Sequence, residues 1–288
     1  MVNKRKEKPQ IITYIIVALL AFVFLYPFWH TAVMSFSDTA FANEPGFKFW
    51  PKIVSLDAYK KVLSDNSIYI GYANTIIRTV FGTIITLAIT FCAAFTMSHK
   101  NLKGKALLNF LIVFTMFFNG GLIPTYMNLK ALGLLNPRWV LILPAAAGAW
   151  NFIIMRNFVS AIGPEMEEAA RIDGASVYQT MLKIILPLSK PVMAVIGLWS
   201  VVNHWNAWYD SLTYANKNDL IVLQTVIRRL IDRSDAEAAA GEVVEMVSSS
   251  PQTVRAATVM IATLPILLGY PFIQKYLVKG TMVGAVKG

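Results

Sequence analysis

The sequence is poor in the residues that usually build chemical sites. Its single cysteine, Cys92, stands inside an apolar run, which excludes an internal disulfide and a zinc site made of several thiolates. We expect Cys92 to be a small buried apolar residue. The three histidines, His30, His99 and His204, are far apart and form no pair at metal-binding spacing. We therefore expect that this chain binds no metal and no cofactor.

Charge is scarce as well. Only 15% of the 288 residues are charged and 56% are hydrophobic, which is too apolar for an ordinary soluble domain. A helix needs roughly 20 mostly apolar residues to cross a bilayer core. The apolar runs lack the alternation of barrel strands, so the sequence predicts an all-α membrane protein.

Six segments are apolar and long enough to span a membrane, and we predict that residues 1–288 form a single transmembrane domain. The predicted spans are residues 11–34, 69–97, 106–126, 139–159, 191–212 and 254–277. They leave three long loops, which are residues 35–68, 160–190 and 213–253.

Basic residues are distributed unevenly over the loops. The N-terminus, the 98–105 loop, the 160–190 loop with Arg156 and the C-terminal tail hold 14 Lys and Arg against 5 acids. The remaining loops hold 11 of each, and Arg78 lies within a span. Because cytoplasmic loops carry the excess of Lys and Arg, we expect both termini and the 160–190 loop to be cytoplasmic. The net charge of +10 then reflects topology and not nucleic-acid binding.

The 160–190 loop predicts a helix–turn–helix outside the membrane. Pro164 suits a first helical position, and the acids that follow it favour the positive end of a helix dipole. Asp173-Gly174 predicts a turn, and Pro187 marks the end of a second helix or a kink. A solvated connector and a helix resting on lipid are alternatives. The acidic start disfavours lipid and the length disfavours a bare connector, so a docking helix for a cytosolic partner fits better.

This loop resembles the EAA loop of ATP-binding-cassette (ABC) importer permeases. The fixed positions are Glu168-Ala169-Ala170, three residues, Gly174, nine residues, Ile184, one residue and Leu186-Pro187. Other segments are similar to the carbohydrate-uptake branch of maltose-permease type, and one of them to Gram-positive complex-sugar permeases. These segments are residues 169–175, 203–208, 274–280, 284–288 and, for the Gram-positive permeases, 118–126. One departure is Gly163, which stands where the branch often has Ile-Pro directly.

The resemblance implies six spans and a specific assembly. A second permease subunit would complete the pore, two cytosolic ATPases would bind the EAA loops, and an external binding protein would deliver a sugar or oligosaccharide. No ATPase phosphate loop occurs in the chain, so ATP and Mg would be used by the partner ATPase. By this resemblance the ATPase-coupling residues are Glu168, Ala169, Ala170, Asp173, Gly174, Ala175, Ile184, Leu186 and Pro187, with Gly284 and Lys287 in the tail.

Other functions remain open at this point. The same architecture could import a polyol or a glycerol phosphate, or the chain could be a membrane receptor or scaffold that does not transport. A membrane-embedded enzyme is disfavoured because no span holds a convergent nucleophile and base.

Arg78 is the formal charge that lies well inside a predicted span, with Asn74 one turn before it on the same face. A charge there is costly and usually faces other helices. We expect structural pairing or pairing with a partner subunit. A direct role in the pore and a misplaced span boundary are alternatives.

An aromatic and amide cluster near the outer end of the fifth span predicts a sugar path or an interfacial aromatic belt. Its members are Asn203, Trp205, Asn206, Trp208 and Tyr209. Helical spacing would place Asn206 and Tyr209 on one face. Two further features are a polar break at residues 119–121 in the third span and helical periodicity over residues 220–231 in the 213–253 loop. That loop could contact a binding protein or be a solvated connector.

Overall fold

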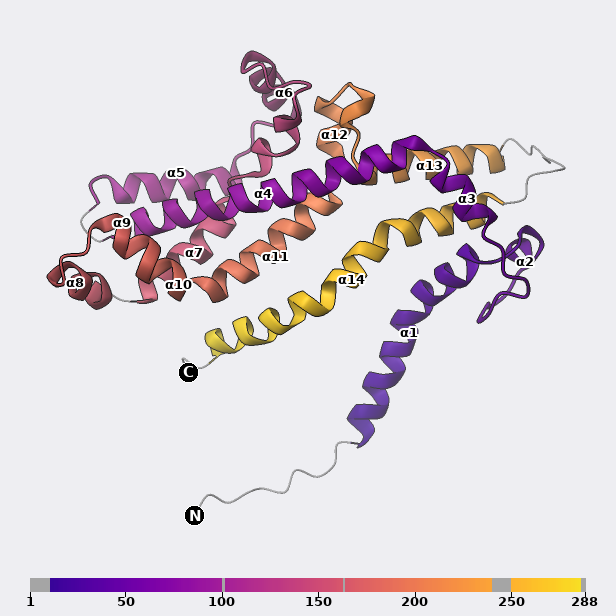
Figure 1. Cartoon of the computed structure of the whole chain (residues 1–288), viewed down its shortest axis with the longest axis horizontal. Coiled ribbons are helices and arrows are strands. Elements are labelled where there is room, and N and C mark those ends of the chain that lie inside the picture. The colour runs from indigo at the N-terminus through magenta and orange to yellow at the C-terminus, as the bar shows by residue number, and fades with distance from the viewer. Residues whose placement is uncertain (1–10, 100–101, 163, 240–249, 286–288) are drawn as a thin grey trace. The chain divides into compact units, whose positions relative to one another are not determined.

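A computed structural model describes residues 11–99, 102–162, 164–239 and 250–285 (Figure 1). The described residues form helices and one isolated bridge between Ser37 and Val54, with no β-strand among them. Two compact units can be distinguished. One contains residues 1–66 and 227–265, and the other contains residues 67–226 and 266–288.

The first unit is built on a single exposed apolar helix. It contains α1 (Ile11–Ser35), α2 (Thr39–Asn43), α3 (Asp57–Leu63), most of α13 (Leu223–Ala239) and the first part of α14 (Pro251–Ala285). Its small core joins Met34, Ala42 and Ala256. The α1 side chains before Val33 are mostly exposed, as expected for a helix that meets lipid or another subunit.

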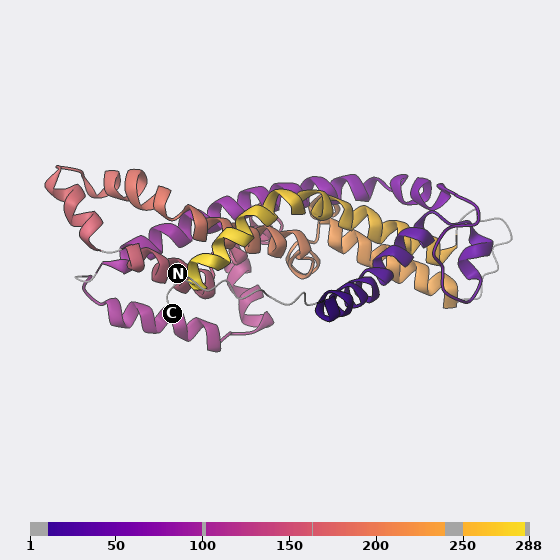
Figure 2. The same ribbon diagram turned by 90° about the horizontal axis from the view of Figure 1, so that it is seen from below.

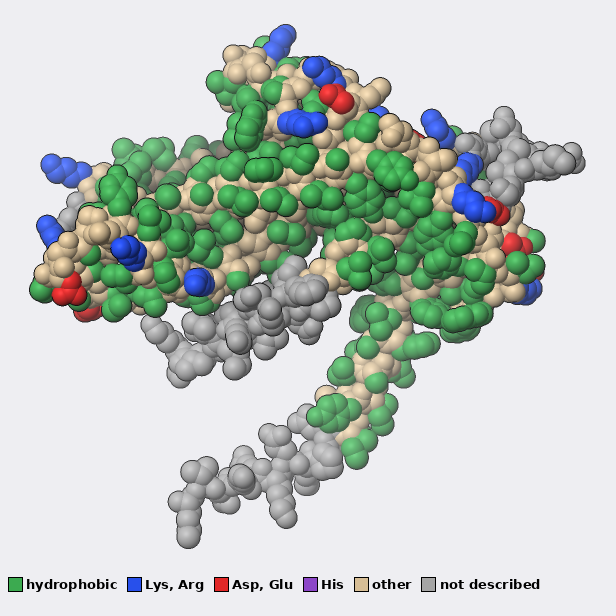
Figure 3. All heavy atoms as spheres, in the orientation of Figure 1, with side chains coloured by type: hydrophobic (Ala, Val, Ile, Leu, Met, Phe, Trp, Pro, Cys, Tyr) green, Lys and Arg blue, Asp and Glu red, His purple; other side chains and the backbone are tan. Residues whose placement is uncertain are grey.

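The second unit contains the long helix α4 and the candidate site. Its elements are α4 (Asn66–Ser98), α5 (Lys105–Phe117), α6 (Leu122–Ala131), η1 (Arg138–Leu141), η2 (Leu143–Ala145), α7 (Ala149–Ile162), α8 (Pro164–Ile172), α9 (Val177–Gln179), η3 (Thr180–Ile185), α10 (Leu186–Leu188), α11 (Lys190–Asn206), α12 (Tyr209–Tyr214) and η4 (Asn218–Leu220). Elements α8 to α10 lie together near one end of α4 (Figures 1 and 2). Hydrophobic side chains cover the visible length of α4 (Figure 3).

Two apolar clusters hold this unit together. The inner cluster joins α4, α7, η3 and α11 through Phe91, Phe95, Met155, Ile185 and Ile196. The second cluster, at the α6 and α12 end, includes Leu129, Val140, Tyr214 and Val222. Both are made of apolar residues far apart in sequence, so they fix the tertiary arrangement of the unit.

Gly82 permits a close approach of the His204 side chain of α11 to α4. A Cβ built at Gly82 would lie 2.4 Å from Nε2 of His204, a side chain that is 1% exposed. His204 is therefore a packed core histidine, and the described residues contain no group of His, Cys, Asp and Glu that could hold a metal.

Helices lie over all six predicted spans, but three of the six are interrupted. The first, second and sixth predictions correspond to the continuous helices α1, α4 and α14. In the third, residues 118–121 separate α5 from α6. Gly121, at φ +85°, takes a conformation that L side chains rarely adopt, and its N–H donates to Oδ1 of Asn119 at 2.8 Å. The polar break noted at residues 119–121 of the third predicted span therefore lies in the segment between α5 and α6.

The fourth and fifth predicted spans are each interrupted near one end. The fourth begins as the short turns η1 and η2, and a continuous helix starts only at Ala149. The fifth ends as a helix at Asn206 and resumes at Tyr209. Three helices in the described chain are long and apolar enough to span a membrane. The number rises to five if the pairs bent by 52° and 75° each count as one span, and α5 is a shorter apolar helix. The count of six stays a prediction.

The prediction that Cys92 is buried was wrong. Its side chain is exposed in this chain. Phe91 and Ala94 turn toward the inner cluster, and each helical step rotates the side chain by about 100°, so Cys92 faces away from it. Apolar character alone did not reveal which face of α4 is buried.

Candidate functional site

The first helix of the EAA loop (residues 160–190) ends in a glycine cap. In α8 the Ala175 N–H donates to the Ala170 carbonyl at 2.9 Å, and the Gly174 N–H donates to the Arg171 carbonyl at 3.1 Å. Gly174 has φ +79° and no neighbour within 4 Å of a built Cβ. This pair of bonds is the Schellman motif, which favours glycine at its left-handed position. Glycine is therefore required here by backbone conformation, while the chain itself leaves room for a side chain.

The second helix of the loop begins with a capping box. Gln179 N–H donates to Ser176 Oγ at 3.3 Å, and Ser176 N–H donates to Gln179 Oε1 at 2.8 Å. Only Ala175 separates this cap from Gly174, so the angle between the two helices is fixed by backbone and cap bonds. The predicted helix–turn–helix is confirmed. Ser176 and Gln179 were missed, although Ser-x-x-Gln is a recognisable cap.

The two halves of the loop have different surroundings. Glu168 and Ala169 on α8 are exposed, and Ala170 is buried at 5% exposure. In the second half Ile185 is 1% exposed, and Ile184 and Leu186 pack against the inner cluster. The second half is therefore anchored in the unit, and α8 presents an outward face.

Three large apolar side chains form an exposed tip at the turn. They are Ile172 at 86%, Tyr178 at 75% and Val177 at 65% exposure, and we call them the tip. Such a group on a tightly capped turn is typical of a protein contact. Sequence reasoning did not assign a contact to these residues. The available signal was their position on either side of Gly174, where a solvated connector would be polar.

Elsewhere in the second unit, a side chain of α4 binds residues at the break between α11 and α12. The Arg78 guanidinium makes a bidentate pair with Asp210, with Nη1–Oδ1 at 3.0 Å and Nη2–Oδ2 at 2.5 Å, and Nη1 also donates to the Ala207 carbonyl at 3.3 Å. Arg78 is 1% exposed. The structural pairing expected for Arg78 is confirmed, and the partner lies within this chain.

Asn74 extends this network toward the next loop. Its Nδ2 donates to the carbonyls of Asp219 at 2.7 Å and Ile221 at 2.9 Å. At the next residue of α4, Thr75 Oγ1 accepts from the Leu223 N–H at 2.9 Å. One polar face of α4 thus fixes both the α11–α12 break and the start of α13.

The aromatic and amide cluster is divided by that break. Trp205 is 8% exposed, and its ring centroid lies 6.4 Å from that of Tyr72, whereas Asn203 and Asn206 are exposed. The shared helical face predicted for Asn206 and Tyr209 was wrong, because α11 ends at Asn206 and α12 starts at Tyr209. Tyr209 is 47% exposed and stands edge-on to Trp208, with ring centroids 5.5 Å apart.

The C-terminal tail is described only in part. Gly284 lies in the last turn of α14, which ends at Ala285, and Lys287 lies outside the described residues.

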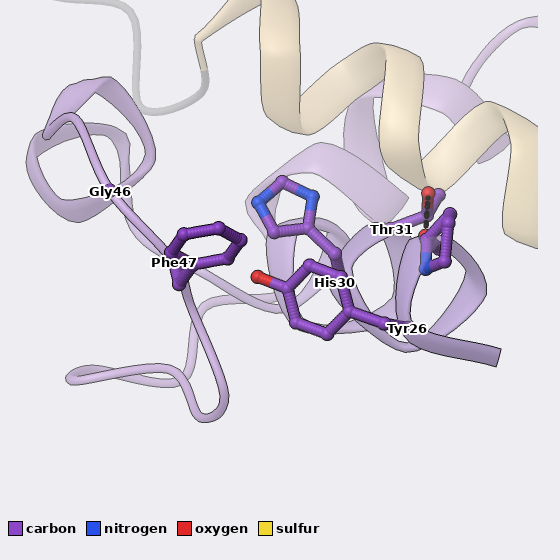
Figure 4. Close-up of a pocket in the computed structure, with 6 residues that line it drawn as sticks. Tyr26, His30, Thr31, Gly46 and Phe47 are labelled. Carbon is purple, nitrogen blue, oxygen red and sulfur yellow. Dashed lines mark hydrogen bonds between the residues drawn. The ribbon is translucent and has the colours of Figure 1, made fainter. Parts of the chain in front are cut away.

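The first unit contains a cavity of about 580 Å³ that the sequence did not indicate. Tyr26, His30 and Phe47 face it (Figure 4), and the Tyr26 ring lies 5.7 Å from that of Phe47. The Lys48 N–H donates to the Tyr26 hydroxyl at 3.2 Å. Aromatic side chains of this kind at the end of an apolar helix are typical of a membrane interface.

Comparison with known proteins identifies the fold that these features share. Residues 67–283 match the family described as "Binding-protein-dependent transport system inner membrane component". The chain belongs to this family. It is a multi-pass membrane protein and a transport component, not an enzyme.

Two relatives from Bacillus subtilis (strain 168) cover nearly the whole chain. The polygalacturonan/rhamnogalacturonan transport system permease protein YtcP is 38% identical over 94% of this chain and 95% of its own. Protein LplC is 40% identical over 92% and 90%, respectively. A crystal structure of a bacterial ABC transporter for import of the acidic polysaccharide alginate matches with TM-score 0.85 and 34% identity, over 92% of this chain and 95% of that one. The fold is that of an ABC importer permease.

The Arg78–Asp210 pair yields a stability prediction. Asp210→Asn should lower the free energy of unfolding by about 3 kcal/mol, because a nearly inaccessible guanidinium would lose its counter-charge. Adding Arg78→Met should recover part of that loss. Thermal unfolding of the purified permease in lipid nanodiscs measures both variants. Asp57→Asn, which removes the exposed partner of Lys60, is the control and should leave the unfolding temperature nearly unchanged. Equal unfolding temperatures for Asp210→Asn and the unmodified chain would contradict the assigned role.

Proposed function

We propose that this chain is one of two permease subunits that form the pathway of an ATP-driven importer of oligosaccharides. The observation that carries the proposal is the capped turn of the EAA loop. Its apolar tip is exposed, and the second half of the loop is anchored in the inner cluster. Such a surface fits a cytosolic protein partner and has no use in a simple connector. The carbohydrate cargo is supported by the relatives, whose names concern polygalacturonan, rhamnogalacturonan and alginate. They favour oligosaccharides over a polyol or glycerol phosphate.

The assembly follows from what this chain lacks. It has no ATPase phosphate loop, so two separate ABC ATPases bind ATP and Mg and dock at the EAA loops. A second permease completes the pathway, and an extracytoplasmic solute-binding protein delivers the cargo, as the family description suggests. The tail residues Gly284 and Lys287 are proposed to reach the ATPase pair.

Both termini and the EAA loop are proposed to be cytoplasmic, on the strength of the uneven Lys and Arg distribution. In a Cys92→Ser background, Glu165→Cys on α8 should resist a membrane-impermeant maleimide in intact cells and react in inverted vesicles. Lys217→Cys, before η4, should behave in the opposite way, and both side chains replaced are exposed. Labelling of Glu165→Cys in intact cells would overturn the orientation.

Docking of the ATPase is tested at the tip. Tyr178→Ser should weaken ATPase binding about 30-fold, the loss of roughly 2 kcal/mol typical of an interface aromatic. The fold should be unaffected because Tyr178 is 75% exposed. Co-purification and titration of the ATPase against the permease in nanodiscs measure the change. The matched control is Tyr69→Ser, which replaces another exposed tyrosine at the opposite end of α4 and should bind normally. If Tyr178→Ser bound the ATPase with unchanged affinity, the loop would be a connector and not a docking site.

The sugar path is proposed to include the exposed amides Asn203 and Asn206 together with Trp205, Trp208 and Tyr209. Asn206→Ala should raise the concentration for half-maximal oligosaccharide uptake roughly three- to tenfold, the loss of about one hydrogen bond. ATPase docking should stay normal. Trp205→Ala is a poorer test because Trp205 is buried and its loss would also disturb packing. Uptake by reconstituted transporter is the measurement. If Asn206→Ala had the same uptake kinetics as the unmodified protein, the cluster would be an interfacial aromatic belt and not a sugar path.

A further inference from the structure

A polar contact joins the first helix of the EAA loop to the long helix of the same unit. Nε2 of His99, in the residue after α4, lies 3.2 Å from Oε2 of Glu167 on α8. The two side chains are 37% and 26% exposed, so the contact is partly shielded from solvent. This contact joins a side chain of α8 to the residue that follows the end of α4.

Both ring nitrogens of His99 face oxygen acceptors. Nδ1 lies 2.9 Å from the Phe95 carbonyl oxygen, and Nε2 faces the Glu167 carboxylate. Both neighbours are acceptors, and a neutral imidazole has only one N–H to donate. The Phe95 ring also stands edge-on to the imidazole, with centroids 4.9 Å apart, which limits its rotation.

Helix α4 extends from this contact to the α11–α12 break. Its 33 residues span about 50 Å at 1.5 Å per residue. Near the His99 end, Phe91 and Phe95 pack in the inner cluster with Ile185 of the EAA loop. Toward the other end, Arg78 holds Asp210 and the Ala207 carbonyl. A single continuous helix thus touches both the EAA loop and the proposed sugar path.

We propose that His99 and Glu167 are positioning residues that transmit the movement of α8 to α4, and through α4 to the break at residues 207–208. The inference rests on the proposed function, because it presupposes an ATPase that moves α8. It adds a named contact and a route within this chain. Its requirement is a positive group at residue 99 facing a negative group at residue 167.

The experiment uses the complete transporter in proteoliposomes and measures oligosaccharide molecules imported per ATP hydrolysed. His99→Gln and Glu167→Gln should each lower this ratio roughly two- to fivefold, the range expected for a partly exposed ion pair, with ATPase docking unchanged. His99→Lys, which restores the charge, should recover most of it. The double variant His99→Gln/Glu167→Gln should be no worse than either single one. Glu165→Gln, in the same helical turn, is the control and should couple normally.

A second measurement is independent of transport. Amide hydrogen exchange of α8 in the permease alone should be faster in His99→Gln than in the unmodified protein, and His99→Lys should return it toward normal. Unmodified protein that imports no oligosaccharide would overturn the proposed function, and the exchange measurement would still decide whether His99 positions α8. Normal import per ATP in both Gln variants, or His99→Lys as defective as His99→Gln, would overturn the inference.

Discussion

A guanidinium buried in an apolar helix needs a counter-charge, and much of the second unit is arranged to provide one. Arg78 is almost inaccessible to solvent, and Asp210 reaches it from the first turn of α12. If α11 continued as a straight helix through residue 210, the Ala207 carbonyl would bond within that helix and would not be free for Arg78. The interruption after Asn206 and the ion pair are therefore one feature. It gives the proposed sugar path a fixed non-helical backbone, which a membrane protein tolerates where protein surrounds it.

The EAA loop is stabilised in a different way, by backbone and cap hydrogen bonds with little burial around the turn. The Schellman bonds end α8, the capping box starts α9, and only Ala175 lies between Gly174 and Ser176. A turn of this kind resists bending while its apolar side chains remain accessible. Combined with an anchored second half, it suits an element that must receive force from a partner and pass it on without yielding.

Cap and turn residues made much of the EAA loop predictable from the sequence. Pro164, the acids after it and Gly174 located the two short helices, and the motif spacing identified the family to which the chain belongs. The breaks inside the third, fourth and fifth spans were harder, because hydropathy measures lipid compatibility and not helical continuity. Partners far apart in sequence could not be read at all. Asp210 for Arg78, Glu167 for His99 and the outward face of Cys92 all depend on which sides of α4 meet other helices, and a single sequence does not contain that information.

The η3 segment relates the nine-residue interval between Gly174 and Ile184 to the direction of the tip. Thr180–Ile185 is a π-helix, in which the Leu186 N–H donates to the Met181 carbonyl five residues earlier. Such a segment holds one residue more than an α-helix making the same bonds. If the same residues formed an ordinary α-helix, the extra residue would rotate the tip about 100° around the helix axis relative to the anchored residues. The π-helical segment therefore sets the direction in which the Tyr178 side chain leaves the protein, independently of which apolar residues fill the nine-residue interval.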